Sequence, residues 1–173
     1  MNRERGTLVV INPYNQEQID KIKIFEAQLD SGLPVQASQI LTRIREQYRE
    51  EEYQSKKRQD NEIAENLYLE VDQAYVVSCF IEGYKDLSEC TLDLVCLKQA
   101  QGKGYLATTI HLAYEYAVTQ LGMQEVSFQL PKEVAEKENI QEQTGFVPLL
   151  QNETSIYFDK PAFLESKMGT HRL

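Results

Sequence analysis

The chain has 173 residues, of which 42% are hydrophobic and 26% are charged. This length and composition fit a single folded domain spanning residues 1–173, and they argue against disorder and against collagen. No apolar run reaches the roughly 20 residues that a membrane helix needs, and the first residues lack the apolar stretch of a signal peptide. We therefore expect a compact, soluble, cytoplasmic domain without a membrane partner.

The net charge of −9 is spread unevenly along the chain. Residues 1–60 hold ten basic and ten acidic side chains, whereas residues 61–173 hold eight basic and seventeen acidic ones. An acidic surface repels phosphate backbones, so we expect no nucleic-acid partner. Such a surface favours cationic small molecules or basic side chains, and it serves solubility equally well.

The cysteines and histidines give no sign of a metal site. Cys79, Cys90 and Cys96 lie in apolar runs without a CxxC pair, so we expect reduced thiols in a reducing compartment. His111 and His171 are too few and too scattered for a histidine-based site. We therefore expect no metal.

The first elements are a strand, two helices and a group of strands. A β-branched run predicts a strand over Thr7–Asn12, and apolar residues at helical spacing predict helices over Gln16–Leu29 and from about Ser38 to Arg58. Two turns, at Asp72-Gln73 and over Tyr84–Ser88, separate the strands that follow. The three predicted strands are Asn66–Val71, Ala74–Ile81 and Glu89–Leu97.

Helices and strands alternate in the rest of the chain. A helix is predicted over Tyr105–Leu121, with Gly122 just past its end, and another begins at Pro131 and ends near Thr144. The predicted strands are Glu125–Leu130, Val147–Leu150 and Ser155–Phe158. The order is β-α-α-β-β-β-α-β-α-β-β, in which hairpins precede a βαβ unit. This order predicts an α+β, or mixed α/β, domain with one mostly antiparallel sheet flanked by helices.

A glycine-rich loop joins the strand Glu89–Leu97 to the helix at Tyr105. Its Gly102-Lys103-Gly104 turn lets backbone amides approach a ligand, and the helix N-terminus adds unpaired N–H groups. This geometry suits a phosphate or pyrophosphate, although a tight structural turn would have the same sequence. Neither the Walker pattern nor the dinucleotide fingerprint is present.

With this loop in place, the sequence resembles the GNAT family, the acetyl-CoA-dependent N-acetyltransferases, over nearly the whole chain. The family's loop, Q/R-x-x-G-x-G/A, matches Gln99-Ala-Gln-Gly102-Lys-Gly104 literally. We prefer the register Gln101-Gly-Lys-Gly104-Tyr-Leu106, because Tyr116-Ala117 and Leu121-Gly122 then fall in step with the "GKGYxT…YA…LG" run of ribosomal-protein-type members. Gly145-Phe146 resembles the family's "GF" pair.

The sequence departs from the family pattern at several positions. Leu106 stands where the family has glycine or alanine, and Ala107 where that run has threonine. The family often has an asparagine shortly after the fifth strand and a tyrosine four residues before the glycine of "GF". These two positions hold Val134 and Gln141 in this chain. In the family the tyrosine is the usual general acid for the departing thiolate, so that role has no obvious holder in this chain.

The resemblance implies direct transfer of an acetyl group from acetyl-CoA to a primary amine, without a metal or a covalent enzyme intermediate. The acceptor would be a small-molecule amine or an amine of a protein, and the class allows a homodimer. The pantetheine arm would pair with the fourth strand near Leu94, Val95 and Cys96. The pyrophosphate would lie on the loop, whose residues are Gln101, Gly102, Lys103, Gly104, Tyr105 and Leu106.

The general base that the resemblance requires has two candidates on the fourth strand. Asp93 is the only charge inside an otherwise apolar run, and burial would make it a stronger base. Glu89, at the start of the strand, is the second candidate. Alternatively, Asp93 pairs with a neighbouring group and Glu89 is a solvated turn residue. We expect Tyr157 to pack in the core rather than reach the thioester, and Gln141 to face solvent.

The residues are compatible with two functions. The first is an acetyl-CoA-dependent N-acetyltransferase. The second is a GNAT-like domain of weak or no activity that binds acetyl-CoA or a protein partner, which the departures at Leu106, Val134 and Gln141 favour.

Overall fold

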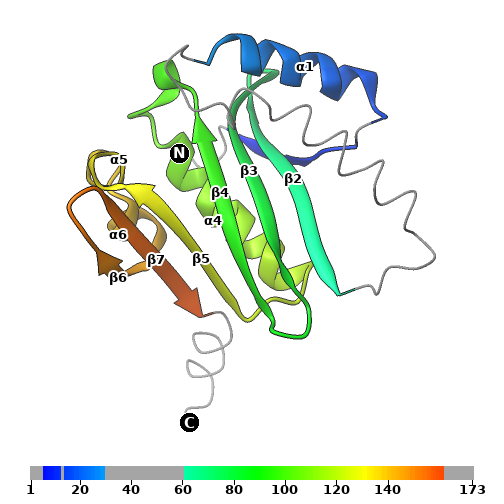
Figure 1. Ribbon diagram of the computed structural model, residues 1–173. Coiled ribbons are helices and arrows are strands. Elements are labelled where there is room, and N and C mark those ends of the chain that lie inside the picture. The colour runs from blue at the N-terminus through cyan, green and yellow to red at the C-terminus, as the bar shows by residue number, and fades with distance from the viewer. Residues whose placement is uncertain (1–5, 13, 30–60, 162–173) are drawn as a thin grey trace.

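The computed structural model describes residues 6–12, 14–29 and 61–161 (Figure 1). The predicted helix from Ser38 to Arg58 lies outside these residues. None of the described helices is long and apolar enough to cross a membrane. The elements are β1 (Thr7–Val10), α1 (Gln16–Ala27), β2 (Glu62–Val71), β3 (Ala74–Tyr84), β4 (Glu89–Cys96), the 3-10 helix η2 (Lys98–Ala100), α4 (Tyr105–Thr119), β5 (Glu125–Pro131), α5 (Lys132–Lys137), α6 (Ile140–Thr144), β6 (Val147–Gln151) and β7 (Ser155–Pro161).

The seven described strands form one sheet in the order β1-β2-β3-β4-β5-β7-β6. Short turns join β2 to β3 and β3 to β4, and every neighbouring pair except β4–β5 is antiparallel. The β4–β5 pair is parallel because α4 carries the chain back across the sheet between them. This arrangement confirms the predicted α+β fold with one mostly antiparallel sheet.

The two faces of the sheet are covered by different helices. Leu67 and Tyr68 are consecutive in β2, so their side chains point to opposite faces. Leu67 belongs to the core that packs against α4, whereas Tyr68 packs against Phe25 of α1 with ring centroids 5.2 Å apart. We refer below to the α4 face and the α1 face of the sheet (Figure 1).

The parallel strands β4 and β5 separate along their length. They pair only from Glu89, opposite Glu125, to Leu92, opposite Phe128. Beyond Leu92, β4 continues along β3, while β5 continues along β7, and the two carboxyl ends diverge (Figure 1). In open α/β sheets, ligands bind outside the carboxyl ends of neighbouring strands. The point of separation therefore marks where a ligand is expected.

The helix predicted from Pro131 to Thr144 is broken into α5 and α6. Between them Asn139 has a φ of 56°, in the left-handed region that asparagine tolerates better than most residues. The break turns the chain at Glu138, whose side chain is buried. The sequence does not show this break, because neither glycine nor proline interrupts the stretch between Pro131 and Gly145.

Candidate functional site

The loop between η2 and α4 contains two glycines in the left-handed conformation. Gly102 and Gly104 have φ values of 82° and 84°, and a Cβ added to either would meet nothing within 4 Å. The helical hydrogen bonds of α4 begin with Thr108 N–H donating to the Gly104 carbonyl at 3.0 Å. The earlier N–H groups of α4 therefore point out of the helix end, towards open space beside the glycines.

The predicted loop residues all lie in or beside this turn, but they contribute different groups. Lys103 is exposed, whereas Tyr105 is half-buried. Leu106 is 2% exposed and packs in the core of the α4 face, so its side chain is directed away from the loop surface. A leucine at this position thus leaves the outer surface of the turn open.

A carboxylate that no sequence pattern had indicated contacts this loop. The N–H of Gly102 donates a 2.7 Å hydrogen bond to Oε2 of Glu138, which is 6% exposed. In sequence, Glu138 cannot be told from the solvated glutamates around it, because only the break after α5 turns it inwards. The predicted phosphate loop therefore already holds an anionic oxygen.

The three strand residues predicted to contact the pantetheine arm lie beyond the point where β4 and β5 separate. Leu94, Val95 and Cys96 are half-buried and pair with β3. Burial, and then the negative charge of Glu138, raise the pKa of the Cys96 thiol to about 12. Cys96 is therefore a neutral thiol near pH 7, not a nucleophile.

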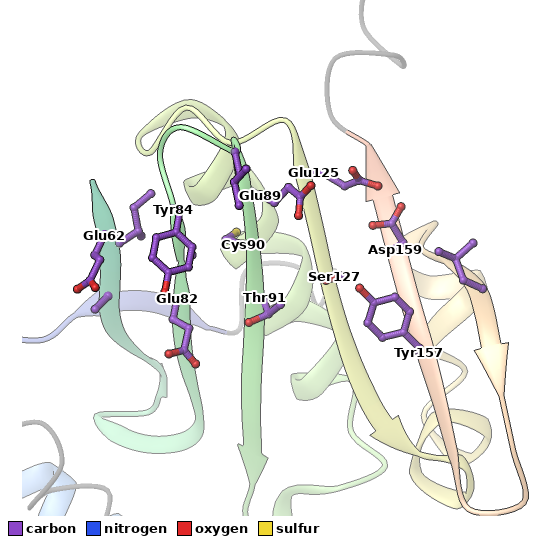
Figure 2. A pocket seen from close by; sticks show the side chains of 15 residues that line it. Glu62, Glu82, Tyr84, Glu89, Cys90, Thr91, Glu125, Ser127, Tyr157 and Asp159 are labelled. Carbon is purple, nitrogen blue, oxygen red and sulfur yellow. The ribbon is translucent and has the colours of Figure 1, made fainter. Parts of the chain in front are cut away.

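A cavity of about 710 Å³ opens on the α1 face of the sheet, where β4 and β5 are still paired (Figure 2). Its described lining includes no lysine, arginine or histidine. Two tyrosines, Tyr84 and Tyr157, and apolar side chains such as Leu87 and Leu149 form part of its wall. Five carboxylates from five strands line it: Glu62, Glu82, Glu89, Glu125 and Asp159. We call this cavity the acidic pocket.

Two carboxyl groups of the acidic pocket, those of Glu125 and Asp159, interact with each other. A hydrogen bond with Asp159, then burial, then the charge of Asp159 raise the pKa of Glu125 above its ordinary value of 4.5. Figure 2 shows the two side chains on adjacent strands, both at the end of the pocket where Glu89 lies. The hydrogen bond, burial and the neighbouring charge therefore all disfavour ionisation of Glu125.

Substituting Glu125 tests this repulsion through stability. Because the folded-state pKa is raised, folded wild-type protein loses stability as the pH rises from 4.5 through the folded value. Glu125→Gln keeps a hydrogen bond to Asp159 without the second charge, so we expect its Tm to exceed that of the wild type by about 2 °C at pH 8. The difference should shrink towards pH 4.5 in calorimetric scans. A difference that is constant with pH would contradict the raised pKa of Glu125.

The structure separates the two candidate bases. Glu89 is exposed and lines the acidic pocket. Asp93 was expected to be buried, and this expectation is wrong, because its position on the α1 face of β4 is exposed. It is, however, the first residue of β4 past the last β4–β5 pair, on the same face as Thr91 in the pocket. Asp93 therefore remains a candidate base because of its position beside the pocket, and not because it is buried.

Tyr157 and Gln141 lie in different cavities. Tyr157 is half-buried and lines the acidic pocket, contrary to the expectation of core packing. It stands opposite Gln129, one residue past the last β4–β5 pair, and Figure 2 shows its ring directed towards β5. Gln141 is exposed, as expected, in a separate cavity of about 430 Å³ between α5, α6, β6 and β7.

Within the described ranges, no group of three or more histidine, cysteine or acidic residues is arranged to hold a metal ion. The three cysteines are free; Cys79 and Cys90 are buried and Cys96 is half-buried. Burial raises the pKa of the Cys90 thiol to about 12.

Models of known protein families do not match the chain, and neither does any curated protein sequence. Solved structures do match. A dodecameric spermidine N-acetyltransferase from Vibrio cholerae is 12% identical, with 98% of each chain covered and a TM-score of 0.66. A probable acetyltransferase is 15% identical, with 92% of this chain and 94% of that chain covered and a TM-score of 0.62. The N-acetyltransferase PseH from Campylobacter jejuni is 11% identical, with 91% and 99% covered and a TM-score of 0.58. The chain therefore has the fold of the GNAT-type N-acetyltransferases, as the sequence resemblance predicted.

Proposed function

We propose that this protein transfers an acetyl group from acetyl-CoA to a cationic primary amine. The fold and the open glycine loop support the cofactor, and the acidic pocket supports the acceptor. The pocket is the observation that carries the proposal, because it gathers five carboxylates beside the point where β4 and β5 separate. The free cysteines fit a reducing compartment such as the cytoplasm.

The residues around the loop fit the cofactor. The left-handed glycines leave space at their outer surface, and the N-terminus of the 15-residue helix α4 favours an anion. Lys98 and Lys103, both exposed, add positive charge. The length of β4 from Leu94 to Cys96, which pairs with β3 but no longer with β5, would hold the pantetheine arm. When bound, acetyl-CoA supplies an acyl group that is already activated as a thioester.

The acidic pocket would hold the acceptor in its protonated form. An amine with a second positive charge, such as a polyamine or a basic side chain of a protein, suits five carboxylates better than a neutral amine does. Several of the similar structures carry spermidine N-acetyltransferase in their names. We assign charge recognition to Glu82, Glu89 and the Glu125–Asp159 pair.

Asp93 and Tyr157 would supply the proton transfers. An amine must lose a proton before or during attack, and Asp93 lies on β4 just past the last β4–β5 pair, on the pocket face. Tyr157 of β7 lies opposite Gln129 of β5, also just past the last β4–β5 pair, so its phenol would protonate the departing thiolate in place of the family's tyrosine.

The alternative function, a weakly active or inactive domain that binds acetyl-CoA or a protein partner, is favoured by Gln141 at the usual position of that tyrosine. As in the class, a homodimer is part of the proposal.

A pair of substitutions separates the two roles. We expect Asp93→Asn to lower kcat by roughly 100-fold with little change in the KM for spermidine, because it removes a base and not a binding group. Glu89→Gln should raise the KM for spermidine about fivefold at nearly constant kcat. Release of free thiol from acetyl-CoA measures both.

The matched control is Asp72→Asn, at an exposed turn whose backbone φ of 51° asparagine accepts. It should leave kcat and KM unchanged.

A thermal-shift series with coenzyme A, ATP and NAD tests the cofactor itself, since a ligand of the folded state raises Tm. Stabilisation by ATP or NAD but not by coenzyme A would contradict acetyl transfer, and an unchanged rate in Asp93→Asn would remove Asp93 as the base.

A further inference from the structure

Glu138 is placed unusually for an acidic residue of this protein. Among the described residues it is the only acidic side chain that is fully buried, at 6% exposure. Its backbone N–H caps α5 through the Val134 carbonyl at 2.9 Å, and the left-handed Asn139 that follows turns the chain sharply. The backbone therefore fixes the residue so that its side chain points to the loop between η2 and α4.

The Glu138 carboxylate lacks a cationic partner within the described part of the chain. Neither the ion pairs of Lys21 with Glu17 and Glu70 nor the contact between His111 and Glu115 involves it. Instead, Oε2 accepts the 2.7 Å hydrogen bond from Gly102 N–H. A buried carboxylate held by a backbone N–H group instead of a cation has the same bonding as a phosphate oxygen in a glycine loop.

From this contact we infer that Glu138 occupies the diphosphate subsite of the free protein and must leave it when the cofactor binds, so that this residue sets cofactor affinity. The inference rests on the proposed function, because it concerns the loop assigned to acetyl-CoA. An ionised carboxylate and a diphosphate cannot share the Gly102 N–H, since both are anions that only accept hydrogen bonds. The negative charge of Glu138 also raises the pKa of the Cys96 thiol. Cys96 is the last residue of β4, where the pantetheine arm would pass, so Glu138 lies near the expected path of the cofactor.

The consequence for affinity follows from simple competition. If the loop is open in only a fraction of free molecules, the apparent dissociation constant rises by the inverse of that fraction. Glu138→Gln keeps the size of the side chain and an oxygen that can accept from Gly102, but it removes the charge. We expect it to bind coenzyme A about tenfold more tightly than the wild type does.

The experiment compares the wild type, Glu138→Gln and Glu136→Gln by titration calorimetry with coenzyme A and, separately, with inorganic pyrophosphate. Glu136 is an exposed residue of α5, so its variant changes the net charge equally without touching the loop. Tighter binding of both probes by Glu138→Gln, with Glu136→Gln within about twofold of the wild type, supports the inference. Glu138→Ala, checked for folding by its thermal transition, should also bind more tightly than the wild type.

The possible failures are distinguishable. If the wild type binds coenzyme A and the Glu138 variants bind it equally or more weakly, the inference is overturned while the proposed function stands. If none of the proteins binds coenzyme A, the proposed function fails and the inference fails with it. Binding by the Glu138 variants alone would support the inference most strongly, because the carboxylate would then block the site in the natural chain.

Discussion

Replacing Gly104 with aspartate is expected to abolish coenzyme A binding. The residue has a φ of 84° at the N-terminus of α4, and a Cβ there would enter space with no atom within 4 Å, which we assign to the diphosphate. Two unit charges about 4 Å apart near a protein surface interact by about 4 kcal/mol, which corresponds to a loss of affinity of roughly a thousandfold. Titration calorimetry measures the effect.

The matched control for this substitution is Gly122→Asp, at the other end of the same helix. Gly122 also has a positive φ, 74°, and no atom within 4 Å of an added Cβ. The backbone strain is therefore similar, and a negative charge near the C-terminus of a helix is less favourable than one at the N-terminus. We expect Gly122→Asp to lower Tm at least as much as Gly104→Asp does and to bind coenzyme A normally. Retained affinity in Gly104→Asp would refute the loop assignment.

Replacing Gly83 with alanine is expected to cause the largest loss of stability. A Cβ at Gly83 would collide with the carbonyl oxygen of Glu89 and lie 2.8 Å from the Cα of Cys90, so it meets backbone of the paired strand. Overpacking of this kind costs about 3 kcal/mol, and we expect Tm to fall by roughly 10 °C. Because β3 and β4 would be pushed apart at the acidic pocket, acceptor binding should weaken as well. Calorimetry and the KM for spermidine report the two effects.

Gly6→Ala is the comparison for this prediction. Its Cβ would also be too close to a neighbour, 2.8 Å from Cδ1 of Leu69, but that atom belongs to a side chain, whereas Gly83 would meet backbone. The fall in Tm should therefore be clearly smaller than for Gly83→Ala. An equal fall in Tm in the two variants would contradict this prediction, because it would show that β3 and β4 can move apart at little cost in stability.

For the described residues, the sequence was sufficient to predict the order of the strands and the local turns. The turn at Asp72-Gln73 has φ values of 51° and 69°, as a two-residue hairpin requires, and Gly102 and Gly104 have the left-handed conformation that suits their loop. These features depend on residues that are neighbours in the chain. Local chemistry therefore specifies them without reference to the rest of the fold.

The features that the sequence did not reveal depend on contacts between distant elements. Asp93 lies in an apolar run, yet its face of β4 is exposed, because α1 covers another part of that face. The acidic pocket draws its carboxylates from five strands spread over nearly a hundred residues, so only the strand order brings them together. Glu138 reaches Gly102 across 36 positions, a contact that no spacing rule predicts.

The most direct test of the central claim is a crystal structure of the protein grown with saturating coenzyme A. We predict that the diphosphate lies on the N–H groups of the turn from Gly102 to Leu106, with the Glu138 carboxylate moved away from Gly102. Coenzyme A bound elsewhere on the molecule, with Glu138 still accepting the hydrogen bond from Gly102, would contradict the claim.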